Sequence, residues 1–178
     1  MCSSPTHGSR QIIRGRPVQA VSLSLYPGDE YQSLAALTSS STPIKRLTIL
    51  ILDNTTPSDL LPRIATHLPS LEALHIVALV AQYDPDTLRG SSTLLSAFPA
   101  LRYLTFMASN ATGSLEEEAS IAACWARSCP TLRTIIMPQG KVWFPMNGRW
   151  ICDTSDIGCT HGKNGKDGGS DGGAAETN

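Results

Sequence analysis

The sequence predicts an α/β fold in which short parallel strands alternate with helices, and three observations support this. Five stretches share one spacing, in which an apolar residue is followed by two others, three and five positions later. A proline lies one or two positions before each stretch. The middle residues of the stretches recur at intervals of 26 to 31 positions: Val21, Leu47, Leu74, Leu104 and Ile135. Such a period is typical of a chain that stacks one strand-plus-helix unit on itself, so we expect a short solenoid of about five units.

The first unit is expected to contain a strand and a short helix. Apolar and polar residues alternate over Val18–Leu25, as in a strand with one buried face. A tyrosine and two leucines within 31–37 then follow at helical spacing, and the serines at 39–41 should end this helix. Residues 1–16 are mostly polar and are expected to form an irregular arm.

The second unit carries the strongest local signals. The apolar run over Arg46–Leu52 predicts a strand. Thr56 stands where a helix N-cap belongs, and Pro57 occupies the first helical position, where its missing N–H is not needed. Apolar residues within 60–68 form one helix face that should be buried.

The later units repeat these devices. Asp84 and Pro85 again provide a cap and a proline, and the apolar face that follows reaches Phe98, although a glycine and two serines interrupt it. In the fourth unit Ser114 and Glu117 have the spacing of a capping box, in which each side chain accepts a hydrogen bond from the other's backbone N–H. Each strand is followed by a helix and another strand, so the strands should pair in parallel.

The end of the chain should differ from the repeats. Residues 142–144 and 149–151 predict two strands joined by 145–148, a β-hairpin that caps the C-terminal end of the repeat domain at 17–152. Residues 153–178 are rich in Gly and Asp and bury too little apolar surface to order themselves, so a disordered tail is expected.

Composition limits the function classes. The chain has 178 residues, 41% hydrophobic content and a net charge of −1, with dispersed Lys and Arg, and shows no footprint for nucleic acid. Its longest apolar run is far too short for a bilayer, and its first residues lack the apolar core of a signal peptide. We therefore expect a soluble monomer in the cytoplasm or nucleus.

Neither a metal site nor an active site is predicted. Cys152, Cys159 and His161 are too few for a structural zinc site, which normally needs four ligands. Cys124 and Cys129, near a helix end, are expected to be small buried side chains. The four histidines are dispersed, and the chain has no nucleophile elbow, phosphate loop or dinucleotide motif. The chain is therefore not expected to be an enzyme or to need a cofactor.

Three segments carry a family resemblance. The segment 125–135 (WARSCPTLRTI), followed by GKVW at 140–143, resembles the C-terminal part of fungal F-box-type leucine-rich-repeat proteins, those of mushroom-forming fungi above all. The segments at 68–74 and 98–104 are similar to the repeat junctions of that family. The likeness covers roughly 17–151.

The resemblance implies a ribonuclease-inhibitor-like leucine-rich-repeat solenoid that recognises substrates for a cullin-type ubiquitin ligase. The chain departs from the family in two ways. No segment of it has the pattern of an F-box, and the regular asparagine after the strand is missing, with Leu at position 79. The alternative is a truncated or partial repeat protein with only a structural or interaction role and no ligase docking.

The side chains that alternate with the core positions should form the open face of the sheet, which is the usual partner surface of a horseshoe-shaped repeat array. Tyr103 and Arg46 are expected to anchor a protein partner, because Tyr and Arg are enriched in binding hot spots. The alternative is an ordinary solvated sheet face. The predicted open-face residues are Arg46, Thr48, Ala73, His75, Tyr103, Thr105, Thr134 and Ile136.

Overall fold

The computed structural model describes residues 13–25, 30–81, 83–109 and 111–152. These residues form one seven-stranded sheet whose strands follow one another in chain order. The strands are β1 (Ala20–Leu25), β2 (Arg46–Ile51), β3 (Ala73–Ala78), β4 (Tyr103–Ala108), β5 (Thr134–Ile136), β6 (Val142–Met146) and β7 (Arg149–Cys152). The helices are α2 (Glu30–Leu37), α3 (Pro57–His67), α4 (Pro85–Gly90), the 3₁₀ helix η1 (Ser92–Ala97) and α5 (Leu115–Ser128).

Strands β1 to β5 pair in parallel, and the hairpin strands β6 and β7 continue the sheet in antiparallel pairing. This confirms the predicted alternation of parallel strands with helices and the C-terminal hairpin. The register aligns the repeated apolar positions across the sheet: Val21, Leu47, Leu74, Leu104 and Ile135.

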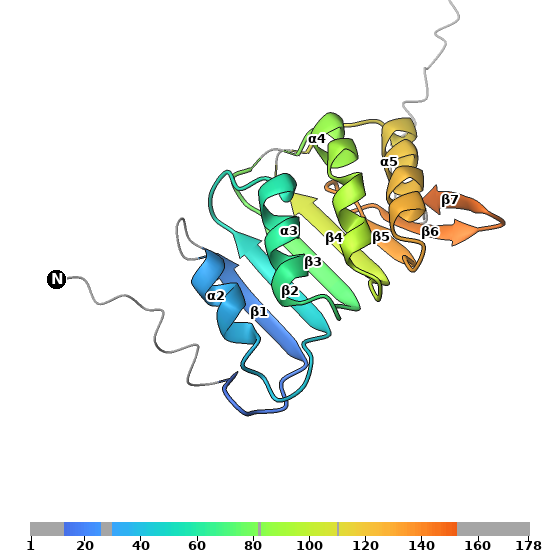
Figure 1. Ribbon diagram of the computed structural model, residues 1–178. Helices are drawn as coiled ribbons and strands as arrows, with labels where there is room; N and C mark the ends of the chain where they lie inside the picture. Colours follow the sequence, from blue (N-terminus) through green and yellow to red (C-terminus); the bar gives the residue numbers. More distant parts are fainter. Residues whose placement is uncertain (1–12, 26–29, 82, 110, 153–178) are drawn as a thin grey trace, which may run out of the picture.

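The helices lie on one face of the sheet and leave the other face open (Figure 1). Between helices and sheet, alternate strand residues form one continuous apolar core. Phe106 on β4 shows this packing. Its ring centroid lies 5.8 Å from that of Tyr83, in an edge-on arrangement, and 5.4 Å from that of Trp125 on α5. The indole Nε1 of Trp125 donates to the carbonyl of Leu88 at 2.9 Å, so α5 is also tied to α4.

The predicted helix starts are present. Thr56, Asp84 and Ser114 each accept a hydrogen bond from the backbone N–H three residues later, as N-caps do. Ser114 and Glu117 form the full capping box. After α2, the hydroxyl groups of Thr38 and Ser39 donate to backbone carbonyls of the helix's last turn, which agrees with its predicted end.

The third unit contains two short helices, and the break between them falls at the glycine and serines that interrupt its apolar pattern. The helix ends at Gly90, and a separate 3₁₀ helix follows from Ser92. The Ser91 hydroxyl donates to the Leu88 carbonyl at 2.8 Å, which satisfies an end group of α4. A glycine followed by serines favours such a break, because these residues have low helix propensity.

The hairpin turn is tighter than predicted. Pro145 and Met146 belong to β6, and the turn consists of Asn147 and Gly148 alone. Both turn residues have positive φ, 51° and 76°. An Asn-Gly pair suits such a turn, because asparagine and glycine tolerate the left-handed conformation that a two-residue hairpin needs.

Two predictions concern the ends of the chain. Within the predicted arm, Ile13 is buried, and Gly15 donates its backbone N–H to Ser39 at 3.0 Å, so residues 13–16 contact the loop after α2. The rest of the arm, residues 1–12, and the predicted disordered tail at 153–178 lie outside the described residues.

Candidate functional site

The open face of the sheet carries three rows of side chains, each with one residue per parallel strand in register, over β1–β5 in the first two rows and β1–β4 in the third. The first row is Ala20, Arg46, Ala73, Tyr103 and Thr134. The second row is Ser22, Thr48, His75, Thr105 and Ile136. The third row is Ser24, Leu50, Val77 and Met107. None of the 14 positions is Asp or Glu, and Arg46 is their one Lys or Arg.

A hollow of about 320 Å³ lies over the middle of the first and second rows. Ala73 is the small residue between Arg46 and Tyr103 in the first row, so its short side chain leaves room between two long ones. The hollow is lined by Arg46, Ala73, His75, Tyr103, Leu104, Thr105, Thr134 and Ile136. Five of the six polar residues predicted for the open face therefore border one depression, and Thr48 lies outside it.

His75 and Thr105 form a linked pair in this hollow. The Nδ1 atom of His75 and the Oγ1 atom of Thr105 are 2.9 Å apart, on neighbouring strands in register. The hydrogen bond to Thr105 orients the imidazole. Thr105 is only 4% exposed and therefore offers little surface of its own. Sequence alternation places Thr105 on the open face correctly but gives no sign of this burial.

The charge in the hollow comes from Arg46. Burial, and secondarily the guanidinium of Arg46, lower the pKa of His75 below its usual 6.5, so the imidazole is neutral at pH 7. Tyr103 is 49% exposed, and its hydroxyl has no hydrogen-bond partner among the described residues. The hollow therefore offers one permanently charged cation, a free phenol and a neutral imidazole.

Three of the four residues in the third row are apolar, Leu50, Val77 and Met107, and none of them was among the predicted open-face residues. Met107 is 41% exposed, while Leu50 and Val77 beside it are half-buried. The signal was available, because the period of two that selects Arg46 and Thr48 also selects Leu50 on the same strand. The open face therefore combines a hollow of mixed polar and apolar lining with apolar residues four positions beyond the first row along the strands.

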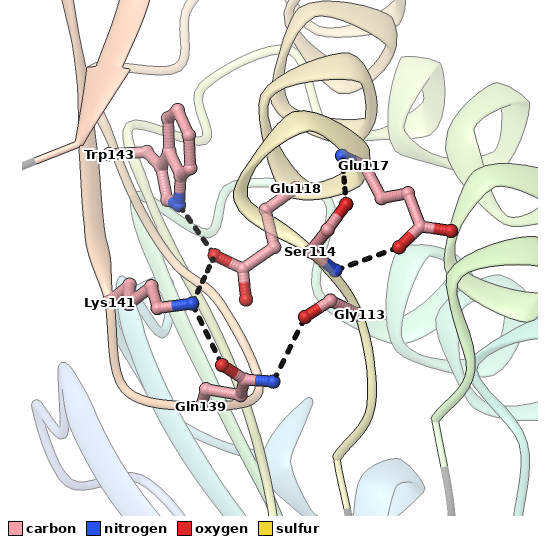
Figure 2. A network of polar contacts seen from close by, with 7 residues as sticks. All are labelled: Gly113, Ser114, Glu117, Glu118, Gln139, Lys141 and Trp143. Atoms are coloured by element: carbon pink, nitrogen blue, oxygen red, sulfur yellow. Dashed lines mark hydrogen bonds and ion pairs between the residues drawn. The ribbon is translucent and has the colours of Figure 1, made fainter.

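A polar network connects α5 to residues 139–143, which lead into and begin the C-terminal hairpin (Figure 2). Glu118 of α5 is buried and accepts a hydrogen bond from Trp143 Nε1 of β6 at 3.1 Å. Lys141 Nζ lies 3.8 Å from the same carboxylate oxygen and donates to Gln139 Oε1 at 2.8 Å. Burial raises the pKa of Glu118 above its usual 4.5, although both partners act in the opposite direction. The network joins α5 to the hairpin, which pairs with β5.

The arrangement in the hollow supports binding better than catalysis. A histidine beside a hydroxyl is the beginning of a nucleophile–base pair. Here the hydroxyl is buried, and the charged group that shifts the pKa of His75 is a cation, whereas a carboxylate usually orients such a base. Arg, Tyr and His donors around a small hollow can instead hold an anionic or polar side chain.

The described residues contain neither a candidate metal site nor a helix that could span a membrane. Among the described residues no group of three or more His, Cys, Asp or Glu is placed to hold a metal ion, and Cys159 and His161 lie outside them. Cys129 is buried, with its Sγ 3.5 Å from the Phe98 carbonyl, and Cys124 is half-buried. No helix within the described ranges has the length and apolarity needed to cross a bilayer.

Comparison with protein-family models, with curated proteins and with solved structures finds no significant match.

Proposed function

We propose that this chain is a protein-binding module that contacts its partner through the open face of the sheet. The observation that carries the proposal is the combination on that face of a hollow bordered by Arg46 and Tyr103 with the exposed Met107 and its half-buried apolar neighbours in the third row. Arg and Tyr are among the residues enriched in binding hot spots. Covering an apolar strip is favourable because it removes apolar surface from water.

The rigidity of the face also supports binding. Its strands are held by the core beneath them, and His75 is fixed by Thr105. A preformed surface loses little conformational freedom when a partner binds, so more of the contact energy appears as affinity. The ordered strands are also the feature that a leucine-rich-repeat solenoid would provide, and we propose that architecture for 17–152.

The family resemblance suggests a context for this binding, namely substrate recognition in a cullin-type ubiquitin ligase. It is supported by the repeat junctions at 68–74 and 98–104 and by the segment 125–135. A longer gene product with an F-box upstream of these residues would support the ligase role. A complete gene that encodes these residues alone would favour an interaction protein without ligase docking.

Affinity capture with quantitative mass spectrometry tests the binding face. The first bait is the unchanged chain, and the second carries Arg46→Gln and Tyr103→Ala. The control bait carries Arg127→Gln and Leu115→Ala on α5, which match the first pair in charge and in exposure, with Leu115 at 44% and Tyr103 at 49%.

We expect proteins enriched by the unchanged bait to be lost from the open-face variant and retained by the control. Each bait must first show the same far-UV circular dichroism and melting temperature. If the open-face variant captures the same proteins as the unchanged chain, the open face is not the binding surface.

A further inference from the structure

The amino ends of the parallel strands carry an excess of positive charge. A charged residue directly precedes each of four strands: Lys45 before β2, Glu72 before β3, Arg102 before β4 and Arg133 before β5. They lie side by side, because the backbone N–H of each of the last three donates to the carbonyl of the one before at 2.8 Å. We call these four residues the basic rim.

One acidic group does not balance this charge. Lys45 Nζ pairs with the Glu72 carboxylate at 2.8 Å, and that contact is the first cause of the lowered pKa of Glu72. Arg46, Arg102 and Arg133 have no carboxylate within 4.0 Å among the described residues. Of these three, Arg46 is the one that lies in the first row of the open face, while Arg133 Nη1 donates to the Leu132 carbonyl at 3.4 Å.

Resting on the proposed function, we infer that the hollow over Ala73 accepts an acidic side chain from an extended segment of the partner protein. Arg46 would donate to the carboxylate, and the free hydroxyl of Tyr103 would donate a further hydrogen bond. The surface is complementary to an acid because its three rows contain no Asp or Glu.

The third row determines a second feature of the segment. The first and third rows are four residues apart along the strands, or about 13 Å at roughly 3.3 Å per residue. In an extended segment, side chains at i and i+4 point to the same side. A segment along the strands can therefore place an acidic residue over Ala73 and an apolar residue, four positions away, on Val77 and Met107.

A protein segment fits this surface better than a nucleic acid. The chain as a whole carries a net charge of −1, whereas nucleic-acid-binding domains are usually strongly basic. An apolar row offers nothing to a phosphate backbone. The basic rim is also short, with four residues of which three are cationic.

The test uses random 12-residue peptides displayed on phage and selected on the full chain. Enriched peptides are synthesised with a fluorescent label, and their Kd is measured by anisotropy. They are measured against the unchanged chain, Arg46→Gln, Met107→Asp and the control Arg127→Gln. A 12-nucleotide uridine RNA is measured in parallel, and a second selection uses Arg46→Glu.

We expect enriched peptides to carry Asp or Glu with an apolar residue four positions away. Arg46→Gln should weaken them about tenfold or more, as expected for a lost hydrogen bond between charged groups, while Arg127→Gln leaves Kd within about twofold. Selection on Arg46→Glu should shift the enriched residue from acidic to basic.

The remaining outcomes separate the inference from the proposed function. Peptides without acidic excess, or peptides insensitive to Arg46→Gln, that still lose binding in Met107→Asp would overturn the acidic-segment inference and leave the open face as a binding surface. Peptides that bind all variants equally, or no enrichment at all, would overturn both. Tighter binding of the RNA than of the peptides would overturn the inference in favour of nucleic acid.

Discussion

Replacing Leu74 by alanine should cost a large part of the stability of this fold. Leu74 is 0% exposed on β3, and its register neighbours Leu47 and Leu104 are 0% and 1% exposed. Leu→Ala changes in such sites cost about 2–5 kcal/mol, the larger values arising where the cavity cannot collapse. Because neighbours on both sides are fixed in paired strands, we expect about 3–5 kcal/mol, or a melting temperature lower by about 6–20 °C.

Leu79→Ala is the matched control, because it makes the same chemical change just after the same strand. Leu79 is 48% exposed, so its truncation should cost about 1 kcal/mol or less. Urea denaturation followed by tryptophan fluorescence measures both free energies of unfolding, since Trp125 is fully buried in the native state. If the two variants differ by less than about 1 kcal/mol, the claim that strand positions in register form one shared core is wrong.

Three further predictions concern polar groups. Trp125→Phe removes one of the two hydrogen bonds to the Leu88 carbonyl and part of a fully buried ring, so the free energy of unfolding in urea should fall by about 1–3 kcal/mol. An unchanged value would contradict the link between α4 and α5. The raised pKa of Glu118 means that the folded state holds more protons than the unfolded state above pH 4.5. The stability of the unchanged chain relative to Glu118→Gln should therefore fall as pH rises from 4.5, and a pH-independent difference in melts would refute this. The lowered pKa of His75 predicts the opposite pH dependence: relative to His75→Gln, the unchanged chain should lose stability as pH falls below 6.5. The same pH series of melts measures this difference, and a pH-independent difference would refute the prediction.

The fold was predictable where the signals are local. The helix starts could be predicted from their N-caps, because an N-cap depends on a few neighbouring residues; these caps are Thr56, Asp84 and Ser114. The apolar repeat indicates the strands because each must bury one face. The break after Gly90 depends on a competition between helix propensity and packing, which the apolar pattern alone does not resolve.

The candidate site was predictable only in part. Alternation along each strand places Arg46 and Tyr103 on the open face. The hollow depends on Ala73 lying between them across three strands, and the His75–Thr105 contact joins residues 30 positions apart. Such contacts follow from the register, which a single strand does not specify.

The most direct test of the account is a methyl NMR titration of the chain with a peptide enriched in the selection. We expect shifts at the methyl groups of Leu50, Val77 and Met107 on the open face, and none at Leu60 or Leu61, which are buried residues of α3. Shifts confined to the helix side, with the open-face methyl groups unchanged at saturation, would contradict the claim that the open face of the sheet is the binding surface.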